Sequence, residues 1–232
     1  MLIPALTIDE NKYCKPVPSS TPLFKAIKES LSNKNFIYFL IATFSFSTAL
    51  NLIISGLMFF VTVLCNIPTS EGSMMVIFLV FLSLLFYPVI NMLAKKYSEK
   101  KIMIYSFILL ALVFAGIAML GKLPVPPKYL IYLLIGLTSF PLASLGILPT
   151  ALLARLVSLD KIKSGDSREG TFFAVNYFAV KLGQTIGIAL FALLTIYGKD
   201  PGHDWGLRLS AICGCILCLA AGVVFRGYKE TD

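Results

Sequence analysis

Charged residues are scarce in this 232-residue sequence. Asp, Glu, Lys and Arg make up 14% of it, against about 25% in soluble domains, whereas 57% of the residues are hydrophobic and the mean hydropathy is +0.84. This composition excludes a soluble single domain and intrinsic disorder. It also excludes a disulfide scaffold, because the five cysteines are few and mostly lie in apolar runs. An integral membrane protein remains.

Side chains for catalysis and metal binding are equally scarce. The one histidine, His203, lies between Asp200 and Asp204 in a polar stretch, which is typical of a solvated loop. Cys213, Cys215 and Cys218 resemble a metal cluster, but positions 213 and 215 point to different sides of a helix and no second ligand pair exists, so we interpret them as small apolar residues. No nucleophile, base and orienting group occur together. The sequence therefore predicts neither an enzyme nor a metal site.

Six apolar runs are long enough to cross a hydrocarbon core of about 30 Å. They are Phe36–Leu64, Met74–Ala94, Ile102–Leu120, Tyr129–Leu153, Phe172–Tyr197 and Leu207–Phe225. They lack the alternation of barrel strands, so all six are predicted to be helices. The expected fold is an all-α, polytopic membrane protein with an N-terminal tail (1–35), a six-helix domain (36–226) and a C-terminal tail (227–232).

The charges predict an orientation. The twelve acidic residues all lie outside the six runs. Fifteen basic residues occupy the two tails and the second and fourth loops, the other loops have three, and Lys181 and Arg208 lie within spans. By the positive-inside rule both termini are expected to be cytoplasmic. This topology accounts for the net charge of +8, so nucleic acid is not an expected partner.

The N-terminal tail has its own pattern. Met1–Glu10 has no basic region and no long apolar run, so we expect no cleaved signal peptide. Further on, Phe24, Ile27 and Leu31 share one helical face, and Lys25 and Lys28 lie away from it. The pattern predicts an amphipathic helix on the cytoplasmic surface of the lipid bilayer, as an anchor or as a regulatory element.

Polar residues recur within the first span. Thr43, Ser47, Asn51 and Ser55 are four residues apart and form a stripe along one helix. Polar groups that face lipid cost free energy, so the stripe is expected to face protein or water. The stripe has two possible roles, and the sequence leaves both open. It either forms hydrogen bonds between helices or lines a pathway for a solute.

Small residues mark the fourth and fifth spans. A small-residue face in the fourth span consists of Gly136, Ser139, Ala143, Gly146 and Thr150, flanked by Pro141 and Pro149. Such faces favour close helix packing, but the prolines also free carbonyl groups that a bound solute could use. In the fifth span, Gly183 and Gly187 can bring a neighbouring helix close.

Lys181 is the strongest functional signal in the sequence. It lies nine residues into the fifth span, about 14 Å deep at 1.5 Å per residue, close to the bilayer midplane. A lysine there costs roughly 2.5–3.5 kcal/mol of insertion free energy. Tyr177, Gln184 and Thr185 share its helical face. A functional role is favoured over a purely structural one.

Two sequence segments resemble a known family. The run Ser167–Ala174, followed by Lys181–Gly187, is similar to the segment that enters and forms helix eleven in the glycoside-pentoside-hexuronide:cation symporters. These melibiose-permease-like proteins are a branch of the major facilitator superfamily. Ala94–Lys101 looks like a degraded form of their basic loop between helices eight and nine. The resemblance extends from Pro22 to Tyr228 and corresponds to the C-terminal six of the family's twelve helices.

The resemblance implies a fold and a binding site. The six helices would form two three-helix repeats that meet near residues 122–128. The first and fourth spans would correspond to helices seven and ten, which line the central cavity, and Lys181 would match a lysine near the cation and sugar site. The implied sugar-binding residues are Thr43, Ser47, Asn51, Ser139, Thr150, Tyr177, Lys181, Gln184 and Thr185.

The resemblance also limits the expected function. The family's coupling cation, Na⁺ or H⁺, is bound by carboxylates of the N-terminal half, so no cofactor is expected here, and the helix-ten aspartate is replaced in Leu148-Pro149-Thr150. We expect the C-terminal half of a sugar:cation symporter in the bacterial inner (plasma) membrane, which works with a separate N-terminal half or is a truncated remnant. The alternative is a six-helix homo-oligomeric protein, such as a homodimer, without transport activity of its own.

Overall fold

The described part of the chain is a bundle of long helices. The computed structural model describes residues 22–122, 124–164 and 168–230. A short helix, α3 (Leu23–Ser32), precedes six long ones. These are α4 (Lys34–Phe59, continued by the π-helical turn Phe60–Leu64), α5 (Thr69–Lys96), α6 (Glu99–Ala118), α7 (Pro127–Ser164), α8 (Glu169–Leu194, continued by the 3₁₀ turn Thr195–Tyr197) and α9 (Trp205–Arg226). All six are long and apolar enough to cross a membrane, which confirms the predicted fold class.

The observed helices extend beyond the apolar runs. α7 continues to Ser164, well past the predicted Leu153, because residues 154–164 contain no glycine or proline and because Leu156 and Val157 are still buried. Pro88 in α5, and Pro141 and Pro149 in α7, lie inside helices without ending them. Hydropathy locates the part of a helix that lies in the membrane, whereas helix breakers locate its ends.

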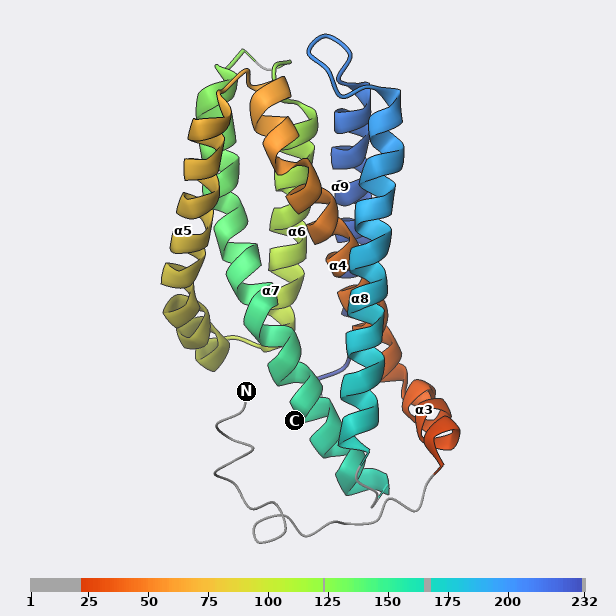
Figure 1. The fold of residues 1–232 in the computed structure, drawn as a ribbon. Coiled ribbons are helices and arrows are strands. Elements are labelled where there is room, and N and C mark those ends of the chain that lie inside the picture. Colours follow the sequence, from red (N-terminus) through yellow and green to blue (C-terminus); the bar gives the residue numbers. More distant parts are fainter. Residues whose placement is uncertain (1–21, 123, 165–167, 231–232) are drawn as a thin grey trace, which may run out of the picture.

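The two three-helix repeats interlock. α4 crosses the bundle (Figure 1) and packs mainly against α8 and α9, while α6 packs against α9 and α7, and α5 packs against α7. Aromatic pairs join the repeats, with ring centroids 4.7 Å apart for Phe36 and Phe172 and 6.1 Å apart for Phe107 and Phe225. Each repeat therefore buries much of its apolar surface against the other.

Residues that follow α9 pack onto one end of the bundle. The Asn35 side chain exchanges two hydrogen bonds with the backbone of Lys229, at 3.0 and 3.1 Å. The Glu230 carboxylate accepts hydrogen bonds from the Lys100 backbone N–H (3.0 Å) and from the Ser98 hydroxyl at the start of α6. Tyr228 is buried, and burial raises the pKa of its phenol. Residues 227–230 thus fix the ends of α4 and α6, whereas residues 1–21, 231 and 232 lie outside the described part.

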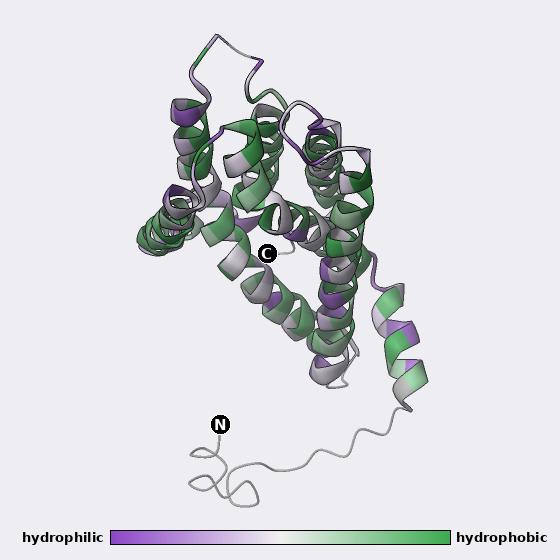
Figure 2. Cartoon of the chain, turned by 45° about the horizontal axis from the view of Figure 1, so that its top comes forward, coloured by the Kyte–Doolittle hydropathy of each residue, from purple (hydrophilic) through white to green (hydrophobic). Residues whose placement is uncertain are grey.

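Figure 2 shows that the long helices are largely hydrophobic, whereas α3 has both hydrophobic and hydrophilic residues. Many large hydrophobic side chains of the bundle are exposed on its outside. The two helices with the least internal burial are α5 and α8. In their most apolar segments only 17% and 22% of the residues are buried, against 44–50% in the other four spans. α5 and α8 therefore offer the largest surfaces for contact with lipid or with another protein.

Candidate functional site

Lys181 lies at the midpoint of α8 and is exposed on the surface of the bundle. Its Nζ lies 5.4 Å from the centroid of the Tyr177 ring, one turn earlier, and the Thr185 hydroxyl donates to the Lys181 carbonyl at 3.0 Å. Tyr177 and Thr185 are exposed as well, and Gln184 is half-buried. We call these four residues the Lys181 face.

The other side of α8 packs tightly against α4. A Cβ atom added to Gly183 would lie 2.7 Å from the Phe44 carbonyl oxygen, and one added to Gly187 would collide with the Thr48 carbonyl oxygen. Both obstacles are backbone atoms, which cannot rotate away. The two glycines therefore allow the α4 and α8 backbones to approach each other, as expected for small residues at helix contacts.

The polar stripe of α4 lies against the Gly183 and Gly187 side of α8. It does not lie beside the Lys181 face, which is on the other side of α8. Thr43 and Ser47 are buried, whereas Asn51 and Ser55 are half-buried. The Ser47 hydroxyl donates to the Thr43 carbonyl at 2.7 Å, and the Asn51 amide donates to the Ser47 carbonyl at 3.0 Å. The described conformation thus shows these groups bonded to their own helix.

Asn176 makes a polar contact between α8 and α4 that was not predicted from the sequence. Its Oδ1 accepts a hydrogen bond from the Thr43 hydroxyl at 3.3 Å, which links α8 to α4. Asn176 precedes Gly183 by seven residues, or two helical turns, and lies on the same side of α8. This spacing was a usable signal, because a polar residue in line with a small-residue pair marks a helix contact.

The two predicted site residues of α7, Ser139 and Thr150, lie apart from the Lys181 face and from the α4 stripe. Ser139 is fully buried and donates to the Ile135 carbonyl at 3.2 Å, whereas Thr150 is exposed. Within the described residues, no hydrogen bond joins either of them to α4 or α8. A buried hydrogen bond instead joins α7 to α6 through Ser144 and Ser106, whose hydroxyl oxygens lie 2.5 Å apart.

Lys181 has no acidic partner among the described residues, and none of the acidic residues falls in a predicted span. In the same ranges, no three His, Cys, Asp or Glu side chains are placed to hold a metal ion. The described part of the chain therefore supplies an exposed ammonium group at the midpoint of a helix that is long enough to cross a membrane, without a matching carboxylate.

A family model described as MFS/sugar transport protein matches residues 3–228. The chain belongs to the MFS/sugar transport protein family. Together with the six spans, this makes it an integral, multi-pass membrane protein, and family membership points to a transporter of sugars rather than to an enzyme. No curated protein and no solved structure gives a significant match. The major facilitator superfamily, predicted from the sequence, is thereby confirmed.

The second charge within the predicted spans of this MFS/sugar transport protein has a structural role. Arg208 is buried at the start of α9, at the end of the bundle opposite α3. Its guanidinium donates to Asp204 Oδ2 at 2.7 and 3.0 Å and to the Ala118 carbonyl at 2.7 Å. The Arg208 hydrogen bonds hold the pKa of the Asp204 carboxyl below its usual range. Arg208 thus caps the C-terminus of α6 and ties it to α9.

Replacing Asp204 by asparagine should destabilise this end of the transporter. Charge-assisted hydrogen bonds contribute about 1.5–3 kcal/mol, and the loss should lower the melting temperature in detergent micelles at neutral pH. Because the pKa of Asp204 is lower in the folded protein, its contribution is complete above the unfolded-state pKa of about 3.9 and is lost as the pH falls through the folded-state value. Asp204→Asn and wild type should therefore converge at acid pH.

Asp200→Asn is the matched control, because Asp200 is an exposed carboxylate in the same connection. It should leave the melting temperature unchanged at both pH values. A neutral-pH loss of equal size in the two variants would contradict the role assigned to the Arg208 and Asp204 pair.

Proposed function

We propose that these six helices form the C-terminal half of a cation-coupled sugar transporter, and that the Lys181 face lies opposite an N-terminal six-helix half. The observation on which this proposal rests is the exposed ammonium of Lys181 at the midpoint of α8, which has no acidic partner in residues 22–122, 124–164 and 168–230. The resemblance of residues 167–187 to helix eleven of the cation symporters supports the same assignment.

The Lys181 ammonium is costly in contact with lipid. The bundle leaves the ammonium on its surface, so in isolation this group would contact lipid at a cost of roughly 2.5–3.5 kcal/mol. The Tyr177 ring offsets only part of this cost, since an exposed cation–π contact contributes about 0.5–1 kcal/mol. A water-filled cavity or a carboxylate from a second half removes the cost. Both are features of a transport pathway between two halves.

The chemistry of the face suits a sugar. The Lys181 ammonium has three N–H donors, the Gln184 amide adds donors and an acceptor, and the Thr185 oxygen adds an acceptor, since its hydrogen is donated to the Lys181 carbonyl. Together they can bind a ring of hydroxyl groups. The Tyr177 ring, which is 64% exposed, adds an apolar surface. A carboxylate from the N-terminal half could hold either Lys181 or the coupling cation, Na⁺ or H⁺. Competition between the two would link cation binding to sugar binding.

The α4 stripe has a different place in this proposal. Thr43 and Ser47 are covered by α8 in the described conformation, so they would reach a solute only where α4 and α8 separate. Asn51 is half-buried and lies at the margin of the same contact. Ser139 and Thr150 remain proposed sugar contacts through the correspondence of α7 to helix ten.

The proposed orientation places the α3 end of the bundle in the cytoplasm of a bacterial cell, with both termini on that side of the inner membrane. The starts of α6 and α8 and the residues after α9 lie at the α3 end (Figure 1), and the basic tails and loops belong to this end. The opposite end has three loop lysines, of which Lys128 pairs with Glu71 at 2.9 Å. This asymmetry supports a cytoplasmic α3 end.

Uptake into proteoliposomes tests the proposal. The chain alone and the chain purified with a co-expressed N-terminal half would be given a radiolabelled galactoside or glucuronide under a sodium or proton gradient. We expect background uptake by the chain alone, because the cation ligands are missing, and gradient-driven uptake by the pair. Gradient-driven uptake by the isolated chain would contradict the half-transporter assignment. A stable homo-oligomer that binds no N-terminal half would favour the non-transporting alternative.

A further inference from the structure

A groove of about 500 Å³ runs between α3 and the first turns of α8. Ile27 and Leu31 form its α3 side, and Ala174, Val175 and Phe178 form most of its α8 side. The volume lies within the range of about 300–1,000 Å³ that is common for ligand sites. Because aliphatic and aromatic side chains form its walls, the groove fits hydrocarbon.

The groove covers much of one lipid leaflet. Phe178 follows Phe172, where the predicted span begins, by six positions, or about 9 Å along the helix, which is within the half-thickness of a hydrocarbon core of about 30 Å. Phe24, three residues before Ile27 on α3, is 86% exposed, as expected for an aromatic residue at the membrane interface. An acyl chain in the groove would thus extend from the α3 end toward the bilayer midplane.

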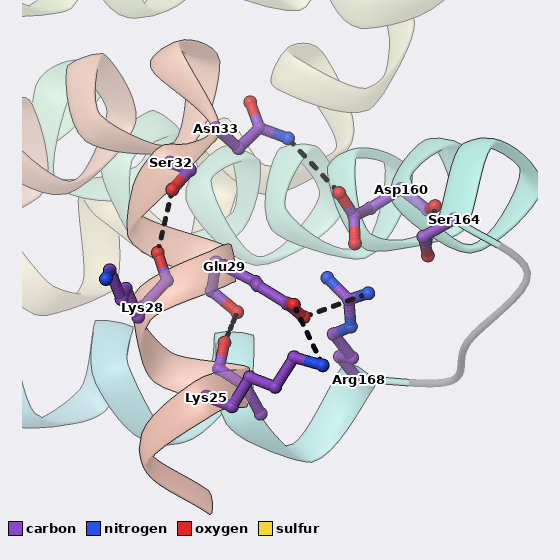
Figure 3. A network of polar contacts seen from close by, with 10 residues as sticks. Lys25, Lys28, Glu29, Ser32, Asn33, Asp160, Ser164 and Arg168 are labelled. Carbon is purple, nitrogen blue, oxygen red and sulfur yellow. Dashed lines mark hydrogen bonds and ion pairs between the residues drawn. The ribbon is translucent and has the colours of Figure 1, made fainter. Parts of the chain in front are cut away.

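Ion pairs hold α3 in place and leave one of its two lysines without an ion-pair partner among the described residues. Figure 3 shows Arg168 and Lys25 converging on Glu29, with nitrogen to oxygen distances of 3.1 and 4.0 Å. This pairing neutralises the one carboxylate of α3. Lys28 points away from the network, is exposed, and makes no ion pair with any described residue. The two lysines leave α3 with a net positive charge beside an apolar groove.

We infer that the groove between α3 and α8 is a binding site for an anionic phospholipid, with one acyl chain against Ala174, Val175 and Phe178 and the headgroup phosphate near Lys25 and Lys28. Charge complementarity selects this occupant, because a neutral lipid would gain nothing from the lysines and a soluble anion would gain nothing from the groove. With the orientation proposed above, the lipid would belong to the cytoplasmic leaflet. α3 would then fix a particular lipid to the start of α8, beneath the Lys181 face.

Native mass spectrometry of the purified full chain tests the inference, since it counts the lipids retained from mixed micelles of phosphatidylglycerol and phosphatidylcholine. Wild type should retain one phosphatidylglycerol in preference to phosphatidylcholine. Lys25→Gln with Lys28→Gln should reduce this preference by about fivefold for each lysine removed. Lys95→Gln, which removes an exposed lysine at the end of α5, should leave the preference unchanged.

A second pair of variants tests the groove itself. Ala174→Trp fills it and should abolish retention, whereas Ala189→Trp, at an exposed position farther along α8, should not. Equal retention of the two lipids, unchanged preference in the double lysine variant, or unchanged retention in Ala174→Trp would overturn the inference. Displacement of the lipid by glycerol phosphate would show a soluble-anion site instead. The readout does not depend on sugar uptake, so its failure is distinct from failure of the proposed function.

Discussion

Replacing Lys181 by methionine is expected to reduce sugar uptake by the complete transporter to background while leaving the six helices folded. Methionine keeps most of the stem but removes the ammonium, so a carboxylate from the other half would lose its partner. Removing one member of such a pair costs roughly 2–5 kcal/mol, which corresponds to at least a thirtyfold loss. Uptake into proteoliposomes and the melting temperature in micelles measure the two effects.

The isolated chain should be no less stable with Lys181→Met, because the variant no longer has the insertion cost of roughly 2.5–3.5 kcal/mol. Lys181→Arg should restore little uptake, since a planar guanidinium does not reproduce a compact ammonium. Lys161→Met, at an exposed site near the end of α7, is the matched control and should transport normally. Full uptake by Lys181→Met would make Lys181 a tolerated charge, and loss of folding would make it structural.

The second large effect concerns the contact of α4 with α8. Gly183→Ala together with Gly187→Ala should lower the melting temperature strongly, because each new methyl group meets a backbone carbonyl oxygen of α4. Overpacking costs about 1–3 kcal/mol at each site, and the backbone cannot yield without separating the two helices. Thermal unfolding of the purified chain in detergent measures the loss.

Gly136→Ala in α7 is the control, with the same chemical change at a position where an added Cβ would meet nothing within 4 Å. It should be neutral or stabilising by up to about 1 kcal/mol, since alanine is the better helix former. If the double variant unfolded at the same temperature as this control, the close approach of α4 to α8 would be wrong.

Hydropathy was sufficient to predict the six spans, because the free energy of burying about 20 apolar residues in lipid depends little on tertiary detail. The C-terminal end of α7 at Ser164 was not predictable from hydropathy, because residues 154–164 lie beyond the apolar run. One sequence also could not decide whether the α4 stripe serves helix packing or a solute pathway, because the answer depends on which face of α8 the stripe contacts. In the described conformation Thr43 donates to Asn176 of α8, and Ser47 lies against Gly183 of α8.

Arg208 and Lys181, the two basic residues within the predicted spans, were also only partly predictable, because their tertiary surroundings are not visible in the sequence. Arg208 follows Asp204 by four residues, a spacing that predicts an ion pair on a helix, but its bond to Ala118 joins segments far apart in the sequence. For Lys181, the sequence indicated depth and the neighbours on its own helix. It could not show that the bundle leaves this face uncovered, because exposure is a property of the assembled helices.

Gradient-driven sugar uptake measures most directly whether these helices form half of a transport pathway with Lys181 facing the other half. The comparison is between proteoliposomes that contain the chain alone, the chain with an N-terminal half, and the same pair with Lys181→Met. We expect uptake above background in the second sample alone. Gradient-driven uptake by the isolated chain, or equal uptake by the pair with and without Lys181→Met, would contradict the assignment of these helices to half of a pathway.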